Sequence, residues 1–242
     1  MASKTIKFGG NEYKISYEIE NLSVEPYILV LHGWGAKKEL MQRVFEAKFF
    51  PNYRLVFVDL PGFGASSQPK FALTSEDYAG IIREFITALG GAPEAIMGHS
   101  FGGKVATLLA PKRLILLSSA GIIEPKPLKV RAKIAVFKCL KYVGLAKFWR
   151  FFASKDASGM SEEMFGTLKN VIREDFEPIF AEIKPEKTLI FWGISDTATA
   201  LSSGEKIHSL IKNSKFYPLD GDHFFFIKHA KFIADTITAE FK

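Results

Sequence analysis

The sequence predicts an α/β fold in which helices cover both faces of a mostly parallel, doubly wound sheet. Short continuous apolar runs recur along the 242 residues, as expected of strands that are buried on both faces. Segments of helical length and periodicity separate these runs, which is typical of parallel strands joined by crossover helices. An alternating pattern near the N-terminus adds an antiparallel hairpin.

The predicted elements follow one another in a regular order. The hairpin is "TIKF-GGN-EYKISYEI", in which Gly9, Gly10 and Asn11 supply the positive φ angles of the turn. Thr74 and Ser75 are candidate caps for the first long helical pattern. The apolar runs are residues 27–31, 55–58, 94–97, 114–117 and 188–192, and a strand-like "KFYPL" follows them. The helical patterns are "SEDYAGIIREFITALGG", "SFGGKVATLLA" and the closing "HFFFIKHAKFIADTITAEF".

This alternation stops after "RLILLSSA" and resumes at "KTLIFWG". An insertion of this size beside the ends of strands is most simply a small helical cap. We therefore expect residues 1–120 and 187–242 to form the core, and residues 121–186 to form a cap that acts as a lid.

Composition limits the class of protein. Hydrophobic residues at 48% and charged residues at 24% are ordinary for a globular domain. The single cysteine, Cys139, excludes an intramolecular disulfide and a cysteine-rich metal site. We expect neither a signal peptide nor a transmembrane segment, because no long apolar run occurs. These features favour a cytoplasmic protein without a metal or cofactor, and they do not indicate its oligomeric state.

The net charge of +6 is concentrated in one segment. Residues 124–155 hold nine basic side chains and one acidic one, a local balance of +8 that leaves −2 for the rest of the chain. The simplest interpretation is a lid whose apolar face covers the site while its lysines stay solvated. An alternative is weak contact with anionic membranes, or guidance of acidic acyl substrates. Nucleic-acid binding is not expected, because no recognised module accompanies the segment.

The stretch "IMGHSFGGKV" fits two motifs with different chemistries. As G-x-x-x-x-G-K it approaches a nucleotide-binding P-loop, and as G-x-S-x-G it is a serine nucleophile elbow. Val105 weighs against the P-loop, because it has no hydroxyl for a magnesium ion. In GTPases the D-x-x-G motif follows the P-loop, whereas here "DLPG" precedes this stretch. The guanine-binding motif Asn-Lys-x-Asp does not occur downstream.

An elbow places Ser100 at a sharp turn between a strand and a helix, where Gly98 and Gly102 relieve the crowding. Gly103 then lets the helix pack close to a neighbour, and Lys104 is an ordinary residue of the first helical turns. A serine hydroxyl is a poor nucleophile at neutral pH, so it also needs a histidine base and a carboxylate.

The candidate base is His223. It falls in "LDGDHFFF", in a loop between a strand and the last helix, where it can reach the sheet edge. His208 and His229 lie within helical patterns, which favours surface positions for both.

The candidate acid is Asp196, which follows a strand in "LIFWGISDTATA". Its alternative interpretation is an ordinary cap or turn aspartate. Asp220 and Asp222 are too near His223 in sequence to approach its ring easily from behind.

Two backbone N–H groups are candidates for an oxyanion hole, without which the nucleophile would be slow. Phe101 follows the nucleophile at a helix N-terminus. Trp34 lies in "LHGWG", where Gly33 and Gly35 let the backbone approach a substrate closely. We expect His32 to brace this loop without a catalytic role.

Five motifs, "LHGWG", "DLPGFGAS", "GHSFGG", "WGISD" and "GDHFFF", together resemble the α/β-hydrolase superfamily in its lidded serine branch. They occur in the family's order and span most of the chain. The resemblance implies the α/β-hydrolase fold and a structural loop at residues 59–64. Many relatives carry a proline shortly after the acid, where this chain has "TATA". The site residues that the resemblance implies are a triad of Ser100, Asp196 and His223, with oxyanion donors at Trp34 and Phe101.

Three functions remain open at this point. The first is a serine hydrolase that cleaves carboxylic esters or thioesters of a small acyl substrate through an acyl-enzyme. The second uses the same triad to cleave a carbon–carbon bond in a diketone-like substrate. The third is a ligand-binding protein of the same fold with little turnover.

Overall fold

The computed structural model describes residues 2–123 and 160–241. Its first two strands, β1 (Ala2–Phe8) and β2 (Asn11–Glu20), form the predicted hairpin. Gly9 and Gly10 both have positive φ angles at its turn, whereas Asn11 is already the first residue of β2. The other strands are β3 (Tyr27–Leu31), β4 (Arg54–Val58), β5 (Ala95–His99), β6 (Arg113–Leu117), β7 (Lys187–Gly193) and β8 (Ser214–Leu219).

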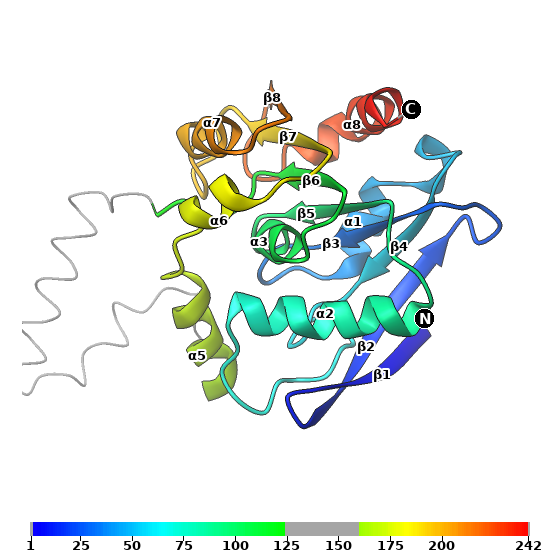
Figure 1. Ribbon diagram of the computed structural model, residues 1–242, viewed down its shortest axis with the longest axis vertical. Helices are drawn as coiled ribbons and strands as arrows, with labels where there is room; N and C mark the ends of the chain where they lie inside the picture. The colour runs from blue at the N-terminus through cyan, green and yellow to red at the C-terminus, as the bar shows by residue number, and fades with distance from the viewer. Residues whose placement is uncertain (1, 124–159, 242) are drawn as a thin grey trace, which may run out of the picture.

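These strands form one eight-stranded sheet in the order β1-β2-β4-β3-β5-β6-β7-β8 (Figure 1). The pairs β1–β2 and β2–β4 are antiparallel, and the pairs from β4 through β3 to β8 are parallel. The sheet is therefore mixed but mostly parallel, and the α/β-hydrolase fold predicted from the sequence is confirmed.

Helices cover both faces of this sheet (Figure 1). The helices on one face are α2 (Ser75–Leu89), α3 (Phe101–Leu108), α5 (Glu162–Val171), α6 (Glu177–Glu182) and α7 (Leu201–Leu210). Those on the other face are α1 (Lys38–Val44), the short 3-10 helix η1 (Ala47–Phe49) and α8 (Phe226–Glu240). Because successive side chains of a strand point to opposite faces, each central strand contributes to two cores. In β3, Leu29 and Leu31 join the core beneath α2 and α3, and Ile28 joins the core beneath α1 and α8.

The first long helix, α2, begins at the predicted cap. The Thr74 side chain accepts a hydrogen bond from the backbone N–H of Asp77, and the Asp77 carboxylate accepts one from the backbone N–H of Thr74. This reciprocal pair is a capping box, so Thr74 is the cap and Ser75 is the first helical residue. The helix ends at Gly90, whose φ of 95° is in the left-handed region.

Two of the described helices, α5 and α6, lie between β6 and β7, in the interval where a cap is expected. Helix α5 is tied to the loop before α2: Thr167 Oγ1 accepts the backbone N–H of Leu73, and Asn170 donates to the carbonyl of Leu73. The boundaries of the cap stay a prediction. The basic segment, residues 124–155, lies outside the described residues.

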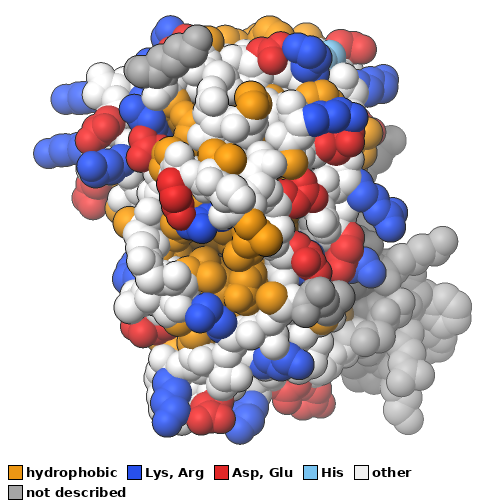
Figure 2. Space-filling model, turned by 90° about the vertical axis from the view of Figure 1, so that its right-hand side faces the viewer, with side chains coloured by type: hydrophobic (Ala, Val, Ile, Leu, Met, Phe, Trp, Pro, Cys, Tyr) orange, Lys and Arg blue, Asp and Glu red, His pale blue; other side chains and the backbone are white. Residues whose placement is uncertain are grey.

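The described surface mixes both signs of charge. Figure 2 views the right-hand side of Figure 1, where Lys and Arg side chains alternate with Asp and Glu around a hollow lined with hydrophobic side chains. The mixture of charges on this face is consistent with the small net charge of the chain outside residues 124–155. Within residues 2–123 and 160–241, no helix is both long enough and apolar enough to cross a bilayer.

Candidate active site

Ser100 lies between β5 and α3, in a conformation that few residues adopt. Its φ is 52° and its ψ is −114°, outside the helical and extended regions. A Cβ atom at Gly98 would lie 2.3 Å from the carbonyl oxygen of Gly102, and one at Gly102 would lie 2.5 Å from that of His32. Glycine is therefore required at both positions, as the elbow motif predicts.

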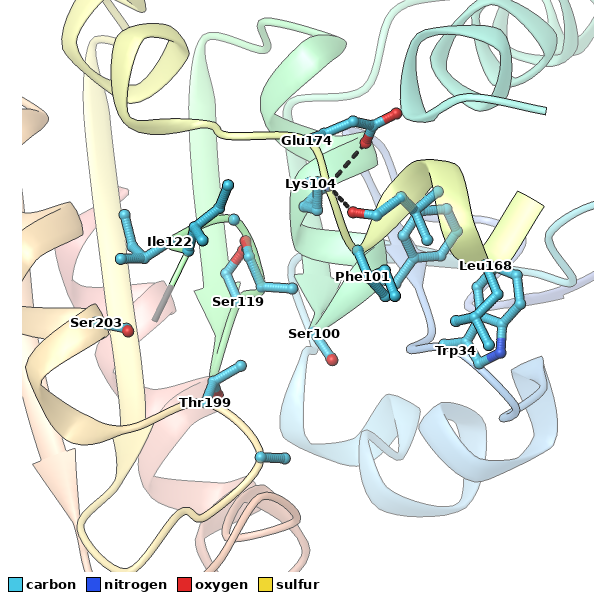
Figure 3. A pocket seen from close by; sticks show the side chains of 16 residues that line it. Trp34, Ser100, Phe101, Lys104, Ser119, Ile122, Leu168, Glu174, Thr199 and Ser203 are labelled. Carbon is cyan, nitrogen blue, oxygen red and sulfur yellow. Dashed lines mark hydrogen bonds and ion pairs between the residues drawn. The ribbon is translucent and has the colours of Figure 1, made fainter. Parts of the chain in front are cut away.

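Ser100 faces a cavity of about 330 Å³. Figure 3 shows its hydroxyl in the middle of the lining residues, with Trp34 and Phe101 on one side and Thr199 on the other. The cavity lies beyond the carboxyl ends of β5, β6 and β7, where open α/β sheets bind ligands. The strained turn therefore presents a hydroxyl to a space large enough for a small molecule.

Asp196 and His223 pair at the same edge of the sheet. Asp196 follows β7, His223 lies between β8 and α8, and Nδ1 of His223 is 2.7 Å from Oδ2 of Asp196. The Asp196 side chain is fully buried. Burial raises the pKa of this carboxyl, but hydrogen bonds from His223 and Thr199 outweigh it and lower the pKa to about 2. Asp196 is therefore ionised at neutral pH and orients the His223 ring.

The loop that holds Asp196 adopts its conformation without the proline that many relatives have. Oδ1 of Asp196 accepts the backbone N–H groups of Ala198 and Thr199, at 2.8 and 2.9 Å. The Thr199 hydroxyl donates to Oδ2 at 2.9 Å, and Nε1 of Trp192 donates to the Thr199 carbonyl. These bonds form a turn around the carboxylate, so Asp196 holds its own loop as well as His223.

The structure brings two of the three candidate catalytic residues into direct contact. Asp196 and His223 are hydrogen-bonded, whereas no hydrogen bond joins Ser100 to His223 within the described part of the chain. Contacts between a nucleophile and its base are often long in a protein without substrate and shorten when substrate binds.

The two candidate oxyanion donors lie beside Ser100. Trp34 and Phe101 both line the cavity, and their rings pack edge to face with centroids 5.5 Å apart. Neither backbone N–H donates in any of the turn and loop hydrogen bonds of the described residues.

A residue that the sequence did not single out, His99, lies beneath His223. Its ring is buried, its Nε2 is 3.0 Å from the carbonyl oxygen of His223, and the two ring centroids are 4.7 Å apart. Burial and, to a lesser extent, the nearby His223 together lower the pKa of His99 to about 3. His99 is therefore neutral, and its Nε2–H donates to the backbone of the loop that carries His223.

The expectation that Lys104 is an ordinary residue of α3 is wrong. Its side chain is 2% exposed and lines the cavity. Its ammonium group donates to the Glu174 carboxylate at 2.8 Å and to the Val171 carbonyl at 2.6 Å (Figure 3). Lys104 was missed because its partners come from a part of the chain that sequence spacing does not connect to it.

The loop after β3 has the bracing histidine that the sequence predicts. Nε2 of His32 accepts the backbone N–H of Leu60 at 3.0 Å, and Nδ1 lies 2.8 Å from the carbonyl oxygen of Gly33. Burial lowers the pKa of His32, so the ring is neutral. His32 thereby ties the Trp34 loop to the loop after β4.

The sequence profile of the Alpha/beta hydrolase family matches residues 28–235. The chain belongs to this family. It therefore has the α/β-hydrolase fold, and its curated relatives include proteins named as an esterase and a lipase.

Two curated relatives of this chain illustrate the similarity. The pimeloyl-[acyl-carrier protein] methyl ester esterase of Pectobacterium carotovorum is 39% identical over 92 residues, which cover 36% of this chain and 33% of that protein. Lipase 1 of Psychrobacter immobilis is 26% identical over 222 residues, which cover 80% of this chain and 69% of the lipase. The match to the first relative thus spans only a third of its length.

A solved structure extends the comparison to the whole hydrolase fold. An esterase from Exiguobacterium antarcticum, EaEST, superposes with a TM-score of 0.75 at 22% identity, and the match covers 99% of each chain. At this identity the likeness establishes the fold.

His208 and His229 lie away from the cavity lining. His208 is exposed in α7, and His229 in α8 donates from Nε2 to the carbonyl of Asp220. Among the described residues, no group of three or more His, Cys, Asp or Glu side chains could hold a metal ion.

Proposed function

We propose that this protein is a hydrolase that cleaves carboxylic ester or thioester bonds of a small acyl substrate through an acyl-enzyme on Ser100. The observation that carries the proposal is the strained turn at Ser100, which presents a hydroxyl to a cavity at the sheet edge where Asp196 and His223 pair. The relatives named for esterase and lipase activity support an ester bond as the target.

In the proposed first half-reaction, Oγ of Ser100 attacks the substrate carbonyl while Nε2 of His223 takes the hydroxyl proton. The ionised Asp196 holds Nδ1–H of the imidazole and stabilises the imidazolium that forms. The negative charge on the carbonyl oxygen is stabilised by the N–H groups of Trp34 and Phe101. The imidazolium then gives its proton to the departing alcohol or thiol.

In the second half-reaction, water attacks the acyl-enzyme and His223 again acts as the base. The proton returns to Ser100 as the carboxylic acid leaves, so the enzyme is regenerated. Every group in this scheme is a side chain or backbone atom of the chain itself.

Labelling with a fluorophosphonate tests the nucleophile directly. We expect intact-mass analysis to show one adduct on the wild-type protein and none on Ser100→Ala. Ser100→Ala or His223→Ala should lower turnover of a p-nitrophenyl ester by about 10⁴- to 10⁶-fold. His208→Ala is the matched control, since this histidine is exposed in α7, and it should keep wild-type activity.

Each contrary outcome has a clear meaning. Labelling that survives Ser100→Ala would place the reactive nucleophile elsewhere. A folded wild-type protein that takes no label would favour a ligand-binding protein with little turnover. Preferential cleavage of a diketone over graded p-nitrophenyl esters would favour the carbon–carbon hydrolase.

A further inference from the structure

The wall of the cavity holds an ion pair between a buried lysine and a partly buried glutamate, which the proposed reaction does not use. Lys104 and Glu174 line the same cavity as Ser100. Lys104 comes four residues after Ser100, so it lies about one helical turn, roughly 6 Å, further along the axis of α3. The pair therefore stands beside the space that the acyl part of a substrate would occupy.

The pair is held firmly in place. Oε1 of Glu174 accepts the backbone N–H of Ser75 at 2.9 Å, and Oε2 accepts both the Ser75 hydroxyl and the Lys104 ammonium. Lys104 also donates to the carbonyl of Val171, and its nitrogen lies 4.2 Å from the centroid of the Phe176 ring. Side chains and backbone from α2, α3 and the end of α5 thus fix the two charges.

The charges determine which ligand the wall can accept. Because Lys104 and Glu174 already neutralise each other, a ligand carboxylate would be repelled by Glu174 and a ligand cation would be repelled by Lys104. An ammonium group has three N–H donors, and two of those on Lys104 have oxygen acceptors among the described residues. Oε1 of Glu174 accepts one hydrogen bond, and a carboxylate oxygen can accept two. Hydrogen-bonding capacity therefore remains on both partners, the lysine nitrogen also faces the Phe176 ring, and the pair carries no net charge.

A hydroxyl group matches this arrangement, because it accepts one hydrogen bond and donates another. A plain hydrocarbon chain would leave this remaining hydrogen-bonding capacity unmet, which is unfavourable once water is excluded. The rest of the lining nearby includes Leu168 and Ile122, which suit the carbon chain between the two polar ends.

We propose that the Lys104–Glu174 pair makes this hydrolase selective for acyl groups that carry a hydroxyl some carbons away from the scissile carbonyl. Lys104 donates to the hydroxyl oxygen, and Glu174 accepts its proton in a hydrogen bond. The inference rests on the proposed function, since it places the acyl chain of a Ser100 substrate along α3.

The test compares kcat/KM for methyl hexanoate with kcat/KM for methyl esters that carry one hydroxyl on the fourth, fifth or sixth carbon. We expect the wild type to prefer at least one hydroxylated ester by about tenfold or more, as sites that bind a substrate hydroxyl do. In Lys104→Met the ratio of kcat/KM for the hydroxylated ester to kcat/KM for methyl hexanoate should fall to near one. The double variant Lys104→Met/Glu174→Gln leaves no unpaired buried charge, and it should lose the preference as well.

The preference is a ratio measured on one preparation, so it does not depend on how much of a variant is folded. Lys187→Met is the matched control. Lys187 also donates to a carboxylate and a carbonyl, both of Glu240, but at the amino end of β7. It should keep the wild-type preference.

No preference in the wild type, or an unchanged preference in both Lys104 variants, would overturn this inference and leave the proposed ester hydrolysis intact. Activity that persists in Ser100→Ala would overturn the proposed function instead. The two failures are therefore distinguishable.

Discussion

At the scale of single residues, His99 links the nucleophile elbow to the loop of the candidate base. It immediately precedes Ser100, and its Nε2–H donates to the backbone carbonyl of His223. Its Nδ1 is buried and has no hydrogen-bond partner among the described residues. A second proton on Nδ1 would find no acceptor there, so protonation of the buried ring disfavours the folded protein.

We predict a pH-dependent contribution of His99 to stability. In the unfolded chain His99 takes up a proton below its ordinary pKa of 6.5, whereas in the folded protein it stays neutral down to about 3. Acid therefore favours the unfolded state, and the wild type loses up to about 1.4 kcal/mol per pH unit as the pH falls from 6.5 toward 3.

The measurement is urea unfolding of the wild type and of His99→Gln between pH 7.5 and 5. Glutamine keeps an N–H donor for the His223 carbonyl but does not titrate, so the variant should lack this part of the pH dependence. The exposed His208→Gln should follow the wild type. Parallel curves for the wild type and His99→Gln would contradict the prediction.

At the scale of elements, close packing of β5, α3 and the loop after β3 creates the elbow. The backbone of Gly102 lies against the carbonyls of Leu31 and His32, which leaves no room for a side chain. At Gly103 the nearest atoms belong to the side chain of Ser119, which agrees with the expected close packing of this helix. The turn therefore depends on glycine more strictly at position 102 than at 103.

We predict that Gly102→Ala lowers the free energy of unfolding by about 1–3 kcal/mol, the usual cost of overpacking. Alanine is the better helix former by about 1 kcal/mol, but its Cβ would lie 2.5 Å from the His32 carbonyl oxygen. Gly91→Ala is the control, because nothing lies within 4 Å of that position. Urea unfolding should show a lower free energy of unfolding for Gly102→Ala than for Gly91→Ala, and only Gly102→Ala should label less with the fluorophosphonate. Equal stability of the two variants would contradict the prediction.

At the scale of the whole molecule, charge is distributed unevenly along the chain. Residues 124–155 carry +8 and the remainder carries −2, which fits the mixed surface of Figure 2. A cluster of this kind attracts anionic surfaces through simple electrostatics. Contact of the basic segment with anionic lipid stays a proposal, because the segment lies outside the described residues.

We predict that reversing charge in this segment weakens binding to anionic vesicles. Co-sedimentation with phosphatidylserine vesicles should fall several-fold when Lys138, Lys141 and Lys147 become glutamate, and added salt should weaken wild-type binding in the same way. The control reverses Lys70, Lys212 and Lys228, which are exposed in the described part of the chain. Equal effects of the two triple variants, or no effect of either, would contradict a role for the segment.

Much of the fold could be predicted because its signals are local. Continuous apolar runs match β3 to β7 to within a residue or two, since strands buried on both faces must be apolar at every position. Helix α1 has no such signal: it has only seven residues, and its polar side includes Lys38, which is buried against Asp59 in an ion pair. That pair joins the first residue of α1 to the residue that follows β4, far away in the sequence.

In the candidate site, too, the features that arise from local sequence could be predicted, and the contacts between distant segments could not. The glycine spacing around Ser100 and the loop positions of Asp196 and His223 can be recognised in the sequence, because tight turns restrict which residues fit. The contact between Asp196 and His223 requires β7 and β8 to be neighbours, and the sequence suggests only their order. The tertiary structure decided that contact.

The sequence by itself determined the family, the elbow and the order of the candidate triad, because steric limits on the backbone and burial on both sheet faces act within a few residues. Only the tertiary structure decided the roles of Lys104 and His99. Their partners, Glu174 and the His223 carbonyl, lie 70 and 124 residues away along the chain. Hydrogen bonds over such separations exist only after the sheet order has brought the segments together.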